Sequence, residues 1–382
     1  MDSAEREELR PKGNVPNLRF PEFQGEWEKC TLGNNVKIQG GYAFKSELFL
    51  RKGIPIIRIS NLPQNASFVD LDDCTYYKEG NYNSFEVHNG DLLIAMSGAT
   101  TGKTAIYNKK TLAYLNQRVG LFKSTNSDSL YYPFLYAFVS TPVFKRQLST
   151  RLIAGAQPNI SSSDIESIRI SIPQKTSEQE KIAHLMLLLD KRIATQNKII
   201  DKLQSLIKGI GKQLFMDNQN WRTVKIGELL RIGNGKDYKH LSIGKISVYG
   251  TGGQMLLVND YLYDGESVCI GRKGTIDTPM FLKGKFWTVD TLFYTYDFKD
   301  VLPKFCYYLF LQINWKLYNE GTGVPSLSKS TIENIKVKIP SLEQQQKICS
   351  ILDCYEHKTN NEEQILELYH SEKQYLLRQM FI

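Results

Sequence analysis

The sequence lacks segments that would direct the chain to a membrane or out of the cell. Its longest apolar runs, such as residues 305–311, fall short of the 18 or so residues needed to cross a bilayer. The first ten residues, MDSAEREELR, are charged and hold no apolar core of the kind a secretion signal requires. We therefore expect a cytoplasmic protein, with residues 1–14 forming a mobile N-terminal lead.

Cysteine and histidine are scarce and are not arranged as metal ligands. The six cysteines form no CxxC pair, and the five histidines form neither an HExxH motif nor a cluster with cysteine at zinc spacing. A chain of 382 residues also needs no disulfides to hold its core. We expect reduced thiols and no metal site.

Signatures of the common nucleotide-using enzymes are missing as well. There is no NPPY or DPPY motif of amino-methyltransferases and no GxGxxG at a strand–helix junction. The segment SGATTGKT at 97–104 is close to a phosphate-binding P-loop, but that motif needs a glycine at Ser97, and Gly98 comes one residue late. We expect instead a β-turn that presents Lys103 and Thr104. No catalytic residue and no cofactor of this chain is predicted.

The composition is that of an ordinary globular protein. Hydrophobic residues make up 41 % and charged residues 23 %, which allows two or three domains with real cores. The net charge of +8, from 48 basic and 40 acidic residues, permits a nucleic-acid partner but does not by itself indicate one.

An internal repeat is the most informative feature of the chain. IESIRISIP at 165–173 matches IENIKVKIP at 332–340, an offset of 167. At an offset of 166, QEKI at 179–182 and KQLF at 212–215 match QQKI at 345–348 and RQMF at 378–381. The repeat predicts two similar domains that alternate with two further segments. Their predicted ranges are 15–174 and 216–340 for the domains, and 175–215 and 341–382 for the segments.

The two further segments have the pattern of long helices that pair. Each follows a proline with a capping box, Ser177 with Glu180 and Ser341 with Gln344. Residues 177–215 carry a net charge of +3 and residues 341–382 a net charge of −3, which favours pairing of one with the other. The alternative is that each helix only covers its neighbouring domain. Apolar residues alternate four and three apart, and the predicted helix-pair seam contains Ile182, Leu189, Ile193, Ile200, Leu203, Ile207, Ile348, Leu352, Leu366 and Leu376.

The two domains have a mixed α/β pattern. Short β-like runs at 54–60, 91–96 and 267–271 alternate with turns rich in Gly, Asn, Ser and Asp. We therefore expect an α+β chain, with two similar mixed α/β domains separated by an antiparallel pair of long helices and related by a pseudo-two-fold axis.

Loops of both domains carry the side-chain types that read base edges and bind phosphates. Arg58 and Arg118 could equally be structural, and Gln157 and Asn159 could simply belong to turns. The candidate DNA contacts are Tyr42, Lys45, Arg58, Asn61, Ser97, Lys103, Asn116, Gln117, Arg118, Gln157, Asn159, Lys236, Lys239, Tyr249, Thr251, Arg272, Lys273, Thr275, Ser326 and Ser328.

The chain resembles a known family over nearly its whole length from about residue 15. The motifs that carry the resemblance are LRFPEFQGEWEKCTLG, GYAFKS, DLLIAMSGATTGKT, LNQRVGLF, YGTGG, GESVCIGRKGTI…FWTVDTLFY and the twin helix starts. Together and in this order they resemble the specificity (S) subunits of type I restriction-modification systems. One departure is Asp277 after GRKGTI, where the family usually has Gly.

The resemblance implies a non-catalytic DNA-binding subunit with two target-recognition domains, each reading one half of a bipartite site. It implies that the long helices dock two modification subunits, which carry S-adenosylmethionine and methylate adenine. Restriction subunits would add translocation and cleavage driven by ATP and Mg²⁺. A pseudo-two-fold repeat also suits two half-sites about one helical turn, roughly 34 Å, apart.

Two other functions remain open from the residues alone. The chain could be a coiled-coil interaction scaffold without base readout, whose domains bind protein. It could also be an enzyme that uses the 97–104 loop, although we expect no nucleotide binding there.

Overall fold

The computed structural model describes residues 13–63, 67–152, 158–216 and 220–382. The chain divides into two compact units. Unit 1 comprises Met1–Lys198 and Gln364–Ile382, and unit 2 comprises Ile199–Glu363. Each unit is a mixed α/β structure, as the sequence predicts.

Unit 1 is built on two four-stranded sheets and a short two-stranded sheet. The larger layers have the strand orders β2-β9-β6-β7 and β4-β3-β8-β5, and β1 pairs with β10. All pairs are antiparallel except β3 with β8. The strands are β1 Glu28–Thr31, β2 Val36–Gly40, β3 Ile54–Ile57, β4 Thr75–Tyr77, β5 Glu86–Val87, β6 Leu92–Ala95, β7 Thr104–Ile106, β8 Ala113–Leu115, β9 Val119–Ser124 and β10 Arg169–Ile172.

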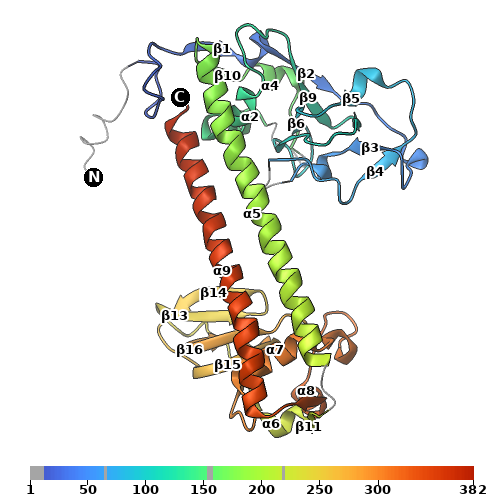
Figure 1. The fold of residues 1–382 in the computed structure, drawn as a ribbon, viewed down its shortest axis with the longest axis vertical. Helices are drawn as coiled ribbons and strands as arrows, with labels where there is room; N and C mark the ends of the chain where they lie inside the picture. Colours follow the sequence, from blue (N-terminus) through green and yellow to red (C-terminus); the bar gives the residue numbers. More distant parts are fainter. Residues whose placement is uncertain (1–12, 64–66, 153–157, 217–219) are drawn as a thin grey trace. The chain divides into compact units, whose positions relative to one another are not determined.

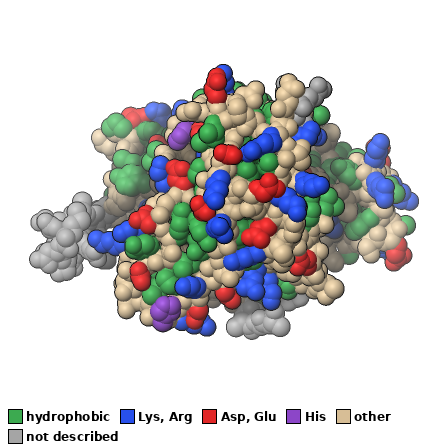
Figure 2. Space-filling view, turned by 90° about the horizontal axis from the view of Figure 1, so that it is seen from below, with side chains coloured by type: hydrophobic (Ala, Val, Ile, Leu, Met, Phe, Trp, Pro, Cys, Tyr) green, Lys and Arg blue, Asp and Glu red, His purple; other side chains and the backbone are tan. Residues whose placement is uncertain are grey.

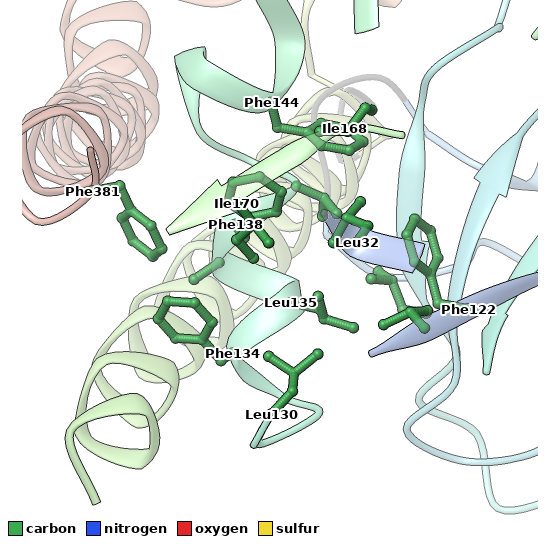
Figure 3. Close-up of a cluster of buried hydrophobic side chains, with 14 of the residues drawn as sticks. Leu32, Phe122, Leu130, Phe134, Leu135, Phe138, Phe144, Ile168, Ile170 and Phe381 are labelled. Atoms are coloured by element: carbon green, nitrogen blue, oxygen red, sulfur yellow. The ribbon is translucent and has the colours of Figure 1, made fainter. Parts of the chain in front are cut away.

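Short helices cover one side of the β2-β9-β6-β7 sheet and close the main core of unit 1. They are α2 Phe134–Phe138, α3 Pro142–Ser149 and α4 Ser162–Glu166, together with the 3-10 turn η1 Leu32–Asn34. Unit 1 also contains the 3-10 turns η2 Ser46–Leu48, η3 Ile59–Asn61 and η4 Asn83–Phe85. Figure 3 shows the core formed by Leu32, Phe122, Leu135 and Phe138 between these elements. The first residues of α5 (Thr176–Met216) and the C-terminal end of the chain complete it.

Unit 2 holds one six-stranded sheet of order β12-β17-β15-β16-β13-β14, and β11 pairs with β18. Its apolar core lies between this sheet, α7 and the ends of the two long helices. The strands are β11 Arg222–Lys225, β12 Arg231–Asn234, β13 Ile243–Gly250, β14 Gly253–Val258, β15 Tyr263–Gly271, β16 Met280–Thr288, β17 Leu292–Tyr296 and β18 Lys336–Ile339. The helices are α6 Ile226–Leu229, α7 Pro303–Gln312, η5 Trp315–Tyr318, α8 Lys329–Asn334 and α9 Leu342–Gln379.

The same strand topology is present in both units, so the predicted internal repeat is a structural repeat. The order β2-β9-β6-β7 in unit 1 corresponds to β12-β17-β15-β16 in unit 2, and the pair β1-β10 corresponds to β11-β18. A parallel strand pair also recurs, as β3 with β8 and as β13 with β16. Part of β16 therefore plays the role that the separate strand β8 plays in unit 1.

One buried glutamine in each unit ties a long helix to its domain in the same way. Gln179 accepts a hydrogen bond from the Tyr131 N–H and donates to the carbonyls of Ser129 and Pro173, at 2.8–2.9 Å. Gln345 accepts from the Leu302 N–H and donates to the carbonyls of Asp300 and Pro340, at 2.8–3.0 Å. Both side chains are fully buried. The QEKI and QQKI match in the sequence is thus a match of function within the fold.

The two long helices lie side by side and antiparallel within each unit (Figure 1). In unit 1 the Lys373 ammonium of α9 binds the Asp190 carboxylate of α5, and the Arg192 guanidinium lies over the Tyr369 ring. In unit 2 the Gln204 amide of α5 bonds Glu363 of α9 at 3.4 Å. Of the predicted seam, seven residues are buried and three, Ile207, Leu366 and Leu376, are half-buried.

The helix starts differ in detail from the capping boxes that the sequence predicts. Ser341 does cap α9, because its hydroxyl accepts the Gln344 N–H at 3.4 Å. The first long helix starts at Thr176, one residue before Ser177, so Ser177 lies inside the first turn and the predicted cap there is wrong. The Glu178 N–H bonds the Lys175 carbonyl instead.

Candidate nucleic-acid interface

In unit 1 the turn between β6 and β7 is bonded to a segment far along the chain. The Gly98 N–H donates to the Pro158 carbonyl at 3.0 Å, and the Ile160 N–H donates to the Met96 carbonyl at 3.0 Å. Ser97 and Asn159 therefore face each other as an isolated antiparallel bridge. The sequence predicted a β-turn at 97–104, and this turn is confirmed.

Three more predicted loops meet the same place through backbone contacts. The Met96 N–H donates to the Arg118 carbonyl at 2.9 Å, and the Asn116 N–H donates to the Ile57 carbonyl at 3.1 Å, beside Arg58. Tyr42 bridges Asn116. We call this convergence junction 1. Its predicted members are Tyr42, Arg58, Ser97, Asn116, Gln117, Arg118 and Asn159.

Unit 2 repeats the convergence with the same backbone bonds. The Gly274 N–H donates to the Pro325 carbonyl at 2.9 Å, the Leu327 N–H to the Arg272 carbonyl at 3.0 Å, and the Arg272 N–H to the Thr291 carbonyl at 2.8 Å. The Val289 N–H donates to the Tyr249 carbonyl at 3.0 Å. A Cβ added at Gly274 would lie 3.6 Å from the Thr251 hydroxyl. We call this junction 2; its predicted members are Tyr249, Thr251, Arg272, Lys273, Ser326 and Ser328.

A glycine at each junction lets the backbones approach closely. A Cβ on Gly41 would lie 2.1 Å from the Asn116 carbonyl oxygen, and one on Gly235 would lie 1.8 Å from the Val289 carbonyl oxygen. No side chain fits at those distances. Both glycines directly follow the first strand of their sheet, β2 and β12, so the repeat extends to this packing detail.

The two junctions share a backbone and differ in their side chains. The equivalent bonds place Met96 where unit 2 has Arg272, Ser97 where it has Lys273, and Asn159 where it has Ser326. Similarly, Arg118 corresponds to Thr291. The scaffold thus holds exposed and half-buried polar side chains of different chemistry in each unit.

Junction 2 opens into a depression of about 380 Å³. Arg272, Lys273 and Lys329 line it together with Glu320, Asn234 and Ser328. Three cations against one carboxylate leave a local excess of positive charge. Hydrogen bonds from the hydroxyls of Thr331 and Ser328 hold the pKa of Glu320 below its usual value, so the carboxylate is charged and orients Ser328.

Two buried polar atoms at junction 1 are candidates for bonding a ligand. Among the described residues, neither the Arg58 Nε nor the Ser97 hydroxyl has a hydrogen-bond partner, although both atoms are buried. Since an unsatisfied buried donor costs about 1–3 kcal/mol, these atoms are suited to bonding a ligand. Arg58 offers a guanidinium, the group best able to bind guanine or phosphate with two parallel bonds.

Other predicted contacts lie elsewhere or serve the protein itself. Asn61 is buried, and its amide bonds the Arg58 N–H and the Asp70 carbonyl at 2.9 and 3.0 Å, so it holds its own loop rather than reaching a base. Lys45 and Lys239 are exposed, and their own backbones bond near neighbours: the Leu48 N–H donates to the Lys45 carbonyl, and the Lys239 N–H donates to the Asp237 carboxylate at 3.4 Å. Lys236 and Thr275 lie beside junction 2, Lys103 ends the β6–β7 turn, and Gln157 falls outside the described residues.

The sequence did not single out three residues of the junction 2 depression, Asn234, Glu320 and Lys329. Asn234 lies two residues before the predicted Lys236, and Lys329 directly follows the predicted Ser328. Glu320 had no signal, since only the fold brings it to Ser328 and Thr331.

The geometry of the 97–104 loop does not favour the alternative of a nucleotide-binding enzyme. The N–H groups of Thr101, Gly102 and Lys103 are used within their own turn by the carbonyls of Gly98, Ala95 and Thr100, so they form no phosphate cradle. In the part of the chain that the structure describes, no three His, Cys, Asp or Glu side chains are grouped to hold a metal ion. No described helix is long and apolar enough to cross a membrane. Figure 2 shows a face on which basic and acidic side chains are interspersed.

Comparison with known proteins identifies the class. A family model described as the type I restriction modification DNA specificity domain matches residues 24–205 and again 218–368. The chain therefore belongs to this family, and the resemblance found in its sequence is confirmed. Specificity subunits are the non-catalytic members of type I restriction-modification systems, so the chain is not itself an enzyme.

Individual relatives cover nearly the whole chain. The type I restriction enzyme MjaVIII specificity subunit of Methanocaldococcus jannaschii is 22 % identical over 91 % of this chain and 90 % of its own length. A putative type I restriction enzyme specificity subunit, MjaX, of the same organism is 25 % identical over 92 % and 93 %. The crystal structure of an S subunit from M. genitalium matches with a TM-score of 0.66 at 17 % identity, covering 96 % of this chain and 99 % of that one, and supports the fold.

Proposed function

We propose that junctions 1 and 2 are the base-reading surfaces of this specificity subunit, each contacting one half of a bipartite DNA site. The observation that carries the proposal is the duplicated backbone with exchanged side chains. Two junctions of the same geometry suit two half-sites of the same double helix. Equivalent positions carry different residues, Arg118 in place of Thr291 and Ser97 in place of Lys273, which predicts a different DNA sequence for each half-site. The recognised site is then not a palindrome.

The side chains at the junctions match the needs of direct readout. Arg and Lys bind guanine O6 and N7, Asn and Gln bind adenine, and each good bidentate pair contributes about 1–3 kcal/mol of discrimination. Exposed Arg118, Gln117 and Asn159 in unit 1 and Arg272 and Lys273 in unit 2 supply these groups. Lysines that contact phosphate would add salt-dependent affinity without sequence preference.

The long helices are proposed to dock two modification subunits. Outside the apolar contacts within the units, α5 exposes Leu188 and Leu206, and α9 exposes Ile351, Leu368 and Tyr375, with exposed fractions of 42–67 %. Apolar side chains that remain exposed along a helix are typical of surfaces that bind other proteins. The partners would carry S-adenosylmethionine for adenine methylation, restriction subunits would use ATP and Mg²⁺, and the complex would act in the cytoplasm.

Exchange of one recognition domain tests the proposal. Residues 216–340 are replaced by the corresponding segment of another specificity subunit, and methylated adenines are mapped genome-wide in cells that also express the modification subunit. We expect one half of the methylated sequence to change and the other half to persist. The matched control replaces residues 15–174 instead and should change the opposite half.

Copurification with the modification subunit shows that both exchanged chains still assemble. If an assembled chain changes both halves or neither, the modular assignment of the junctions is wrong. Protection of DNA by the complex also separates base reading from the alternative, a coiled-coil scaffold whose domains bind only protein, because the scaffold would leave no footprint.

A further inference from the structure

A second polar groove lies within unit 1, apart from the base-reading residues. Its volume is about 880 Å³, within the range of pockets that hold small ligands. It is lined by the β6–β7 turn, α3, and the unit 1 parts of α5 and α9. Nothing in the proposed base readout uses it.

Positive charge dominates the groove. Among the described residues, the charged side chains in its lining are Lys103, Lys145, Lys373 and Asp190, and the other titratable groups there are His370 and Tyr136. Three ammonium groups against one carboxylate leave a net charge of about +2 when His370 is neutral. Such an excess in a concave site attracts an anion.

The one carboxylate is already occupied. Asp190 accepts hydrogen bonds from the Lys373 ammonium and the Ser67 hydroxyl, and its side chain is only 6 % exposed. Lys373, 12 % exposed, also donates to the Ser67 hydroxyl at 3.3 Å. This buried pair anchors one side of the groove and leaves no acid to neutralise the remaining lysines.

The other two lysines of the groove are Lys103 and Lys145. Within the described residues, neither Lys103 nor Lys145 forms an ion pair or a side-chain hydrogen bond. Desolvation of the Lys145 ammonium and the nearby charge of Lys373 both lower the pKa of Lys145. An anion bound beside Lys145 would offset the repulsion from the Lys373 charge.

We propose that this groove of unit 1 binds a phosphate group, held by Lys103 and Lys145 and supported by the Lys373–Asp190 pair. The phosphate belongs either to a free phosphorylated compound or to the backbone of bound DNA, since both present the same group. Because the β6–β7 turn lines the groove and also carries Ser97 of junction 1, an anion there links α9 to the base-reading loop. The inference does not depend on base reading by the junctions.

Titration with inorganic tripolyphosphate tests the proposal on the full chain. Isothermal calorimetry at fixed ionic strength compares the native chain with Lys145→Gln and with Lys110→Gln, an exposed lysine outside the groove. We expect Lys145→Gln to weaken binding about 10-fold and Lys110→Gln to leave it unchanged. Lys103→Gln provides a second groove variant, and thermal unfolding checks that each variant is folded.

A second arm identifies the source of the phosphate. The salt dependence of binding to a duplex without the recognition site is measured for the same variants. A slope smaller by about 0.9 in Lys145→Gln, with tripolyphosphate competing, assigns the phosphate to the DNA backbone. An unchanged slope with weakened tripolyphosphate binding assigns it to a free compound. If neither measurement changes in Lys145→Gln and Lys103→Gln, the groove is not a phosphate site.

Discussion

At the scale of single residues, the most informative side chains bond the backbone of their own unit. Gln179 and Gln345 each satisfy one N–H and two carbonyls that come from separate loops. A buried amide with all its bonds made stabilises a single loop arrangement, because any other arrangement leaves polar groups unpaired. Gln179 therefore fixes the start of α5 on unit 1, and Gln345 fixes the start of α9 on unit 2.

Replacement of Gln345 by methionine keeps the volume and removes all three hydrogen bonds. We expect unit 2 to lose about 3 kcal/mol of unfolding free energy, since three buried backbone groups lose their partner. Chemical denaturation followed by fluorescence measures the change. Gln346→Met, at the exposed neighbouring position, is the matched control and should differ from the native chain by less than about 0.5 kcal/mol. Equal stability of both variants would contradict the role of Gln345.

Arg272 offers a test of base reading at one residue. Among the described residues, its exposed guanidinium contacts the Asp290 carbonyl at 3.5 Å, and it lines the junction 2 depression. In the complex with the modification subunit, Arg272→Ala should reduce methylation of the cognate site about 10–100-fold and relax the sequence at a single position. The control is Arg222→Ala, which removes an exposed arginine that pairs with Asp300 outside the depression. The complex with this variant should methylate the cognate site at the native level. Loss of methylation at all sites equally would indicate a phosphate contact instead.

At the scale of elements, each unit is completed by the end of a long helix. Phe381, after α9, packs against Phe134 and Trp27 of unit 1, with ring centroids 5.4 and 6.2 Å apart (Figure 3). Phe215, in the last turn of α5, packs on Phe305 at 5.3 Å in unit 2. The KQLF and RQMF match therefore marks two equivalent anchors, and each unit depends on residues distant in the sequence.

Removal of one anchor should destabilise one unit alone. Phe381→Ala should cost unit 1 about 3–5 kcal/mol, and Phe215→Ala should cost unit 2 a similar amount, because each leaves a cavity in a packed core. Hydrogen exchange by mass spectrometry should show faster exchange in β2, β6 and β9 for the first variant and in β12, β15 and β17 for the second. Leu368→Ala, at a position 67 % exposed, is the control. Faster exchange in both units from either change would mean that the units do not fold separately.

At the scale of the whole molecule, α5 belongs to both units. Residues 176–198 of this helix lie in unit 1 and residues 199–216 in unit 2, and α9 is divided in the same way at 363 and 364. A continuous helix rises 1.5 Å per residue and resists bending more than a loop does. We therefore propose that the helix pair sets the spacing between the two half-sites.

Insertion of one heptad into each long helix tests this spacing. Seven residues placed after Lys198 in α5 and before Gln364 in α9 keep the seam in register and add about 10 Å. Since B-DNA rises about 3.4 Å per base pair, the methylated site should gain a spacer of about three base pairs, with both half-sites unchanged. Mapping of methylated adenines provides the measurement. A heptad inserted in α5 alone breaks the seam and serves as the control, and an unchanged spacer in the double insertion would show that the helices do not set it.

Much of the architecture was determined by the sequence alone. Local signals, such as the short β-like run at residues 54–60 and the spacing of apolar residues in 182–214, predicted β3 and α5, because propensity and periodicity act over a few residues. The match at offsets of 166 and 167 predicted the structural repeat, because a duplicated segment keeps its core positions. The family resemblance rested on the order of such motifs and was confirmed by the comparisons.

Only the tertiary structure decided which polar residues come together. Ser97 and Asn159 are 62 positions apart in the sequence and form a backbone bridge that no local sequence pattern predicts. Asn61 has the same residue type as Asn116, but its side-chain amide hydrogen-bonds the backbone of Arg58 and Asp70. The charges of Lys145 and Lys373 interact only because α3 and this part of α9 belong to one unit. Contacts between distant segments depend on loop paths and packing, so the junctions and the groove became visible only in the folded chain.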